Sequence, residues 1–167
     1  MMMQTRNIFV CNPMPKFFPA KEIIPGLWIG SEGDSQSRSF FRQHNIGLIV
    51  NCSKTIPFKS TTGIDEYRVP IDDDPRDNAT LVNHLPVVVR TIDAVLSRGK
   101  SVLVHCRAGM QRSASVVAAY IMFKHKVTAN DAMQAIKGVK NETFWPVPTF
   151  DKALSSYEKQ LQAFPNY

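Results

Sequence analysis

The apolar residues of this chain alternate between short continuous runs and longer stripes with helical spacing. Short runs rich in β-branched residues are typical of strands that are buried on both faces of a sheet. One such run forms the last part of the segment 23–30, and others occupy the segments 46–51, 67–71 and 101–104. Pro70 has no backbone N–H to donate, so we expect its strand to lie at a sheet edge or to end there.

Stripes with helical spacing predict five helices between and after these strands. The first is expected over 34–45, the second ends at about Arg98-Gly99, and the third begins at Ser113. The fourth is expected between Thr128 and Gly138, and the fifth begins at a cap at Thr149. Proline favours the first turn of a helix, so the second helix should begin near Asn83 or His84, just before Pro86. Strands precede helices repeatedly and helices then cluster at the C-terminus. We therefore expect an α/β fold with a central, mainly parallel twisted sheet flanked by helices.

The first 20 residues do not fit this alternation. They contain three prolines together with Phe9-Val10 and Phe17-Phe18. This apolar content favours packing over disorder, either on the same chain or against a second copy. We therefore expect an N-terminal arm over 1–20, a catalytic domain over 21–167, and possible homodimerisation through the arm.

Composition limits further the classes of protein to which this chain can belong. A chain of 167 residues that is 44% hydrophobic suits one domain with a sizeable core. The net charge of +6 fits an anionic substrate and would equally fit nucleic acid or a membrane surface. No uninterrupted apolar run of 18 residues occurs, so no membrane span is expected. The three cysteines (Cys11, Cys52 and Cys106) are too few and too scattered for a disulfide framework, which favours an intracellular protein, cytoplasmic or nuclear.

The candidate chemistry lies in the segment 101–122. A short strand, 101–104, is followed by the loop 105–112 and then by a helix that opens at Ser113. A loop between a strand and a helix N-terminus suits an anion, because successive backbone N–H groups can turn inward and the helix dipole adds positive potential. The segment therefore predicts a binding site for a tetrahedral anion.

Cys106 and Arg112 would make this anion site reactive. A loop of this length can wrap one tetrahedral dianion, with the cysteine beneath it and the guanidinium forked over two of its oxygens. The loop N–H groups and Arg112 would also stabilise a thiolate, which is the nucleophilic form of cysteine. The alternative is a buried structural cysteine, as we expect for Cys52.

The segment His105-Cys106-x-x-Gly109-x-x-Arg112-Ser113 resembles the HCxxGxxR[ST] signature of cysteine-dependent protein tyrosine phosphatases. Its variant HCxAGxxRSA, followed by a helix that carries a tyrosine, is most similar to the dual-specificity branch. The resemblance extends weakly from about Lys21 to Leu161. It implies a protein tyrosine phosphatase-like fold.

The resemblance also implies roles for these residues. Cys106 would attack phosphorus, Arg112 would hold the phosphoryl oxygens, Ser113 would stabilise the departing thiolate, and His105 would orient the loop. Backbone N–H groups would bind the phosphate along Arg107, Ala108, Gly109, Met110 and Gln111. Neither a metal ion nor another cofactor is needed, and the four histidines are scattered along the sequence.

The general acid should come from another loop at the same sheet edge. In the resembled family it is an aspartate about thirty residues before the cysteine, after an apolar residue and one further residue. Ile71-Asp72-Asp73 matches that pattern, so we choose Asp73. Asp72 and Asp74 remain open as alternatives, and Asp77 is a more remote one.

The expected function is hydrolysis of phosphotyrosine and phosphoserine or phosphothreonine in proteins, through a cysteinyl-phosphate intermediate. The alternatives are an RNA 5′-phosphatase, a phosphoinositide phosphatase or a phosphate-binding module without activity. RNA-directed relatives tend to have Asn-Arg-Thr in place of Gln111-Arg112-Ser113, and lipid-directed ones tend to have lysines in the loop. The loop 54–63 offers Phe58 but is short and polar, so we expect a shallow cleft that admits both classes of phosphopeptide.

Overall fold

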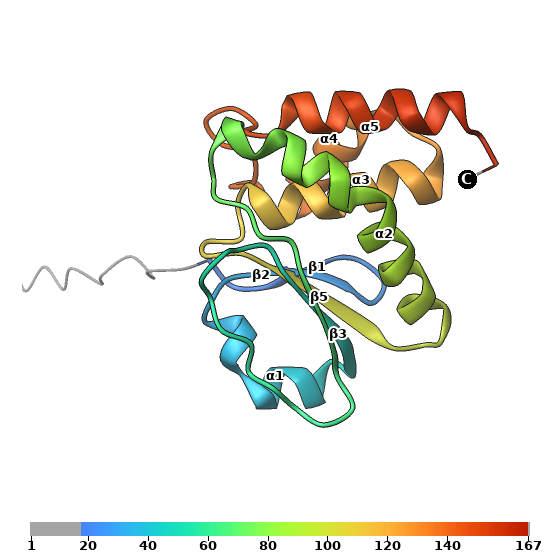
Figure 1. The fold of residues 1–167 in the computed structure, drawn as a ribbon. Coiled ribbons are helices and arrows are strands. Elements are labelled where there is room, and N and C mark those ends of the chain that lie inside the picture. Colours follow the sequence, from blue (N-terminus) through green and yellow to red (C-terminus); the bar gives the residue numbers. More distant parts are fainter. Residues whose placement is uncertain (1–17, 167) are drawn as a thin grey trace, which may run out of the picture.

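The computed structural model describes residues 18–166, and its centre is a five-stranded sheet (Figure 1). The strands are β1 (Lys21–Ile24), β2 (Leu27–Gly30), β3 (Ile46–Asn51), β4 (Asp65–Arg68) and β5 (Ser101–His105). Their order in the sheet is β1-β2-β5-β3-β4. β1 pairs antiparallel with β2, and the other pairs are parallel. The predicted α/β fold with a mainly parallel sheet is confirmed.

Helices cover both faces of the sheet. The 3-10 helix η1 (Asp34–Gln36) precedes α1 (Arg38–Gln43), which lies on one face, and η2 (Pro75–Asp77) leads into the long helix α2 on the other (Figure 1). The four helices on that second face are α2 (Asn78–Ser97), α3 (Arg112–His125), α4 (Ala129–Val139) and α5 (Asp151–Ala163).

β5 shows why the central strands are continuously apolar. Leu103 packs with Phe41 in the core on the α1 side, while Val102 and Val104 belong to the core on the α2 side, and all three are fully buried. Successive side chains of a strand point to opposite faces, so a strand covered on both faces favours apolar residues at consecutive central positions.

Two predicted boundaries are wrong. The fourth strand covers Asp65–Arg68 rather than 67–71, although its position at a sheet edge, which Pro70 suggested, is confirmed. α2 begins at Asn78 and contains Pro86 in its interior. Six apolar side chains of this helix are at most 2% exposed, and their burial outweighs the backbone hydrogen bond that proline removes.

Four further expectations need correction. The segment 23–30 is a hairpin of β1 and β2 rather than a turn and one strand, and 34–45 divides into η1 and α1 at Ser37, whose hydroxyl accepts from Phe40 N. Thr128 caps α4 as expected, but Gly138 lies inside that helix. Thr149 does not cap α5, because the helix begins one residue later and its N-cap position falls to Phe150. The backbone N–H of Thr149 instead donates to the side chain of Gln111 (3.1 Å).

Within the described residues, one helical stretch is long and apolar enough to cross a membrane, namely Pro75–Ser97 with a mean hydropathy of 1.3. Length and composition alone are weak evidence, because a core helix can share them. Here the apolar stripe of α2 packs in the core beneath α3 and α5. The N-terminal arm and its possible role in dimerisation lie mostly outside the described residues.

Candidate functional site

Three segments far apart in the sequence meet at one side of the sheet. They are the phosphate loop (residues 105–112, after β5), the acid segment (residues 71–77, after β4) and the connection between α4 and α5 (residues 140–150). All three lie at the left-hand side of Figure 1. Between them is a cleft of about 310 Å³. Its lining consists of Asp73, Cys106, Arg107, Ala108, Met110, Gln111, Arg112 and Trp145.

Cys106 lies at the floor of this cleft and is 3% exposed. Its Sγ accepts a hydrogen bond from Gly109 N (3.3 Å) and lies 3.2 Å from Ser113 Oγ. Both neighbours can donate to a thiolate, which is the form that attacks an electrophile. Cys52 differs: burial, followed by the nearby Cys106, raises the pKa of its thiol, so it stays neutral and serves as a core residue as predicted.

Gly109 makes the tight turn of the phosphate loop possible. Its φ is +71°, and a Cβ atom there would lie 2.8 Å from Gly30 O. Both the left-handed backbone and the close approach to β2 therefore require glycine. A second contact holds the loop from the same side, because Glu32 N donates to Arg107 O (3.0 Å).

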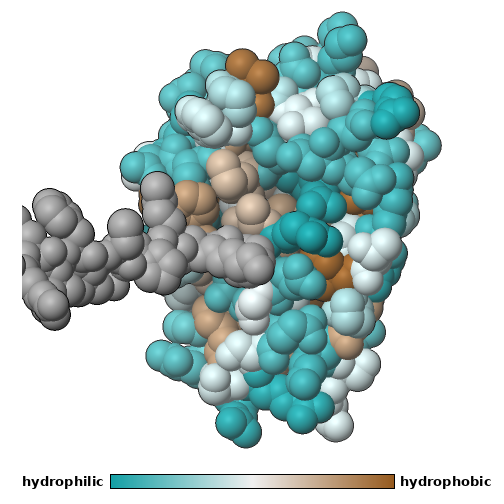
Figure 2. All heavy atoms as spheres, turned by 90° about the vertical axis from the view of Figure 1, so that its left-hand side faces the viewer, coloured by the Kyte–Doolittle hydropathy of each residue, from teal (hydrophilic) through white to brown (hydrophobic). Residues whose placement is uncertain are grey.

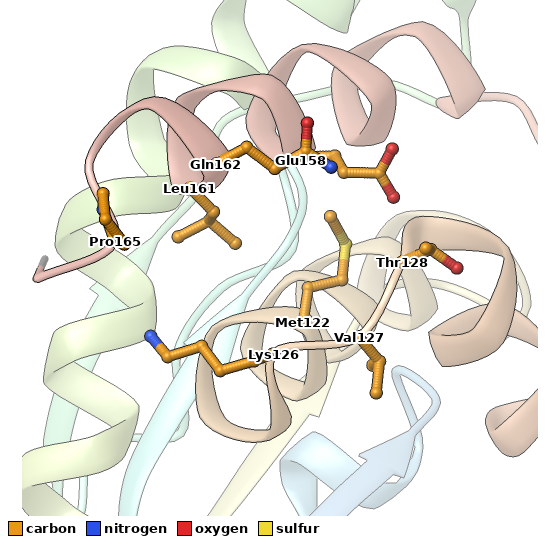
Figure 3. A pocket seen from close by; sticks show the side chains of 8 residues that line it. All are labelled: Met122, Lys126, Val127, Thr128, Glu158, Leu161, Gln162 and Pro165. Atoms are coloured by element: carbon orange, nitrogen blue, oxygen red, sulfur yellow. The ribbon is translucent and has the colours of Figure 1, made fainter.

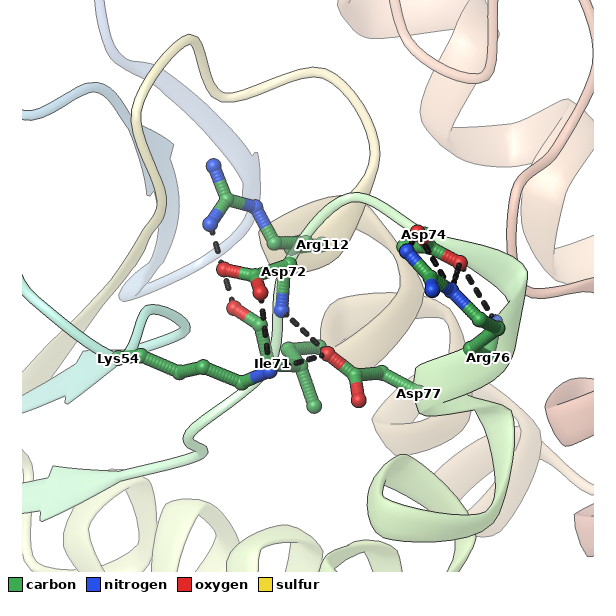
Figure 4. A network of polar contacts seen from close by, with 7 residues as sticks. All are labelled: Lys54, Ile71, Asp72, Asp74, Arg76, Asp77 and Arg112. Atoms are coloured by element: carbon green, nitrogen blue, oxygen red, sulfur yellow. Dashed lines mark hydrogen bonds and ion pairs between the residues drawn. The ribbon is translucent and has the colours of Figure 1, made fainter.

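Arg112 connects the phosphate loop to the acid segment. It is the first residue of α3, and its Nη1 donates to Ile71 O (3.2 Å), as Figure 4 shows. The guanidinium lines the cleft and can still direct donors toward an anion above Cys106. Arg107 is exposed at the cleft rim.

The structure separates the four candidate acids. Asp73 lines the cleft, whereas Asp72 pairs with Lys54 (2.9 Å). Asp77 accepts a hydrogen bond from Asp72 N (2.7 Å) and also pairs with Lys54 (3.0 Å), and these two contacts lower the pKa of its carboxyl (Figure 4).

Asp74 is the candidate acid whose carboxylate is bound most closely by a neighbouring cation. It pairs with Arg76 (2.7 Å), and hydrogen bonds from the side chain and backbone of Arg76 lower its pKa to about 2. A carboxyl held in the ionised form in this way is poorly suited to donate a proton. Among the four aspartates, Asp73 is the one that lines the same cleft as Cys106.

His105 is completely buried beneath the loop. Its Nδ1 donates to Cys106 O (3.4 Å), and no partner is described for Nε2. Burial lowers the pKa of this imidazole to about 4, so it is neutral at physiological pH. The predicted orienting role rests on this single long hydrogen bond.

The sequence reasoning missed one residue of the cleft, Trp145. It also expected Gln111 to act only through its backbone, whereas its side chain binds the connection that carries Trp145. Gln111 Nε2 donates to Trp145 O (3.0 Å) and Val147 O (2.9 Å). The signal available in the sequence was an aromatic residue among prolines between two helices, which does not reveal its spatial neighbours. Phe58, which the sequence reasoning did consider, lies instead against the guanidinium of Arg68 (4.8 Å).

Other parts of the described surface have fewer side chains that could bind or react with a ligand. A hollow of about 360 Å³ lies between the end of α3 and α5 (Figure 3), where Glu158 accepts from Ala129 N (2.6 Å) and so serves to hold α4. In residues 18–166, no three His, Cys, Asp or Glu side chains gather as they would around a metal ion. Figure 2 draws the left-hand side of Figure 1, where the three segments of the cleft lie, and this face is mostly hydrophilic with some apolar patches.

Comparison with known proteins agrees with this geometry. Residues 27–160 match the family model described as "Dual specificity phosphatase, catalytic domain". Human dual specificity phosphatase 28 is 32% identical over 152 residues, which cover 91% of this chain and 84% of that protein. Human dual specificity protein phosphatase 9 is 34% identical, over 87% of this chain and 37% of that protein.

Solved structures lead to the same family. A mouse putative dual specificity phosphatase, complexed with zinc tungstate, superposes with a TM-score of 0.81 at 32% identity, covering 88% of this chain and 91% of that one. The crystal structure of human dual specificity phosphatase 28 gives a TM-score of 0.80 at 30% identity, over 89% of this chain and 98% of that one. The chain therefore belongs to the dual-specificity phosphatases, hydrolases that act on phosphotyrosine and phosphoserine or phosphothreonine in intracellular proteins.

Proposed function

We propose that Cys106 is the nucleophile of this phosphatase and that Asp73 is its general acid. The observation that carries this proposal is the cleft itself. It has Cys106 Sγ at its floor within hydrogen-bonding distance of Gly109 N and Ser113 Oγ, and Arg112 and Asp73 in its walls. A nucleophile, donors for the transferred oxygens and a proton donor are the parts that phosphoryl transfer needs.

In the first step, the Cys106 thiolate attacks phosphorus and an S–P bond forms as the P–O bond to the substrate breaks. Asp73 gives its proton to the leaving oxygen. Arg112 and the backbone N–H groups from Arg107 to Gln111 hold the other three oxygens. Neutral His105 supports this loop from below.

In the second step, water attacks the cysteinyl phosphate. The Asp73 carboxylate accepts a proton from that water, the S–P bond breaks, and inorganic phosphate leaves. Ser113 Oγ–H donates to the departing Cys106 thiolate, which returns to its starting form. The same aspartate thus acts first as acid and then as base.

The proposed substrates are phosphoproteins with phosphotyrosine, phosphoserine or phosphothreonine. The proposed location is the cytoplasm or nucleus, where cysteine side chains remain reduced. The tungstate complex of the mouse relative supports an oxyanion site, because tungstate is tetrahedral like phosphate. Arg107 is the one basic residue that the loop adds to Arg112, so its charge does not favour RNA or a phosphoinositide.

The test is a comparison of substrates combined with chemical trapping. Purified protein should release phosphate from phosphopeptides, with far lower kcat/KM on 5′-triphosphorylated RNA and phosphoinositides. Acid quenching during turnover should leave phosphate on the peptide that contains Cys106, and Cys106→Ala should abolish this label. Labelling of another residue, or activity restricted to RNA or lipid, would overturn the proposal.

A further inference from the structure

Trp145 lies at the cleft with an unusually large exposed surface. Its side chain is 67% exposed although it is one of the largest apolar groups in the chain. A single exposed apolar residue is common on protein surfaces. Trp145 differs from such cases because it lines the same cleft as Cys106 and Asp73.

The segment that carries Trp145 is fixed to the phosphate loop. Gln111 spans it with three hydrogen bonds, donating to Trp145 O and Val147 O and accepting from Thr149 N (3.1 Å). On the other side of Trp145, Phe144 N donates to Met110 O (2.9 Å). Gln111 and Phe144 are 7% and 2% exposed, so these anchors are shielded from water.

These bonds hold the backbone of Trp145 beside the phosphate loop, so the indole is attached at a fixed point of the cleft rim. A phosphate above Cys106 directs the rest of the substrate's side chain outward between the cleft walls. For phosphotyrosine that outward group is a phenyl ring, whereas phosphothreonine presents a short aliphatic carbon chain. Aromatic rings attract one another in stacked or edge-to-face arrangements, an interaction that the aliphatic group lacks.

We propose that Trp145 is a specificity-determining residue that favours phosphotyrosine over phosphothreonine, and that Gln111 is the residue that positions it. This inference rests on the proposed function, because it requires the phosphate to be bound above Cys106. In this proposal Trp145 forms an additional wall of the cleft, which the sequence predicts to be shallow. Such a wall is compatible with hydrolysis of both classes of peptide.

The test is the ratio of kcat/KM for matched phosphotyrosine and phosphothreonine peptides. Trp145→Ala should lower this ratio about three- to tenfold, mainly through the phosphotyrosine peptide. Trp145→Phe should retain most of the preference because it keeps an aromatic ring. Phe164→Ala is the matched control, since Phe164 is 61% exposed and lies at the end of α5 instead of in the cleft lining.

A double-mutant cycle tests the positioning role. Gln111→Glu loses both side-chain donors, so it should lower the ratio in the wild-type background but not when Trp145→Ala is already present. Thermal unfolding should show that both variants are folded at the assay temperature. An unchanged ratio in Trp145→Ala, or an equal fall for both peptides, would overturn the inference. Wild-type protein that is inactive on both peptides would overturn the proposed function, and this inference with it.

Discussion

The phosphate loop and the acid segment form two walls of one cleft but are stabilised in different ways. The phosphate loop contains the buried residues Cys106 and Gly109, and backbone hydrogen bonds join it to Glu32, just after β2, and to the α4–α5 connection. The acid segment is joined to the loop by the hydrogen bond from Arg112 to Ile71 O, and its aspartates form exposed or partly exposed ion pairs with Lys54 and Arg76. Buried backbone contacts fix a shape, whereas surface ion pairs contribute little stability. The ion pairs instead determine which aspartate remains available.

The largest expected effect is in the phosphate loop, from Cys106→Ser. A serine hydroxyl is a far weaker nucleophile unaided, so kcat should fall to less than about a thousandth of wild type. Phosphate analogues such as tungstate should still bind, because the cradle consists of backbone groups and Arg112. Cys52→Ala, assayed well below its melting temperature, is the control and should retain activity. Residual turnover of Cys106→Ser above that level would contradict the nucleophilic role.

The acid segment is tested by Asp73→Asn, which should lower kcat by a factor of about 10²–10⁴ for poor leaving groups. Activated aryl phosphates should be affected less, because their leaving groups need little protonation. Asp72→Asn and Asp74→Asn provide neighbouring controls, since the structure pairs these side chains with Lys54 and Arg76. If either control shows the leaving-group dependence and Asp73→Asn does not, the acid has been assigned to the wrong residue.

The buried His105 gives the phosphate loop a pH dependence of stability. Its pKa is lowered from 6.5 to about 4, so the folded state binds this proton less readily than the unfolded state. The contribution of neutral His105 to the free energy of unfolding is therefore fully present above pH 6.5. It is lost as the pH falls toward 4, and the total loss is about 3 kcal/mol. Urea unfolding of wild type and His105→Asn over this range would measure it. Parallel curves for the two proteins would show that His105 does not contribute.

The smallest effect is expected for Lys54→Met, which removes the exposed ion pairs of the acid segment with Asp72 and Asp77. The melting temperature should change by less than about 3 °C, and the difference from wild type should shrink at high salt. Activity should change by less than about threefold, because Asp73 has no part in these pairs. A loss comparable to that of Asp73→Asn would mean that the Lys54 pairs position the acid.

The sequence by itself determined the local features of this protein. The strand, loop and helix around Cys106 were predictable because their signals lie within about twenty consecutive residues. Continuous apolar runs likewise identified β3 and β5, since strands buried on both faces are apolar along most of their length. Pro86 misled the prediction of the start of α2, because burial of the helix outweighed a local preference.

Tertiary structure decided what depends on distant contacts. Asp72, Asp73 and Asp74 are equivalent as neighbours in sequence, and pairing with Lys54, 18 residues away, helps to distinguish them. Trp145 enters the cleft because Gln111 binds its backbone carbonyl across 34 residues. Such contacts form only when the chain is folded, and the physical reason is that a hydrogen bond or an ion pair depends on distance in space and not on separation along the sequence.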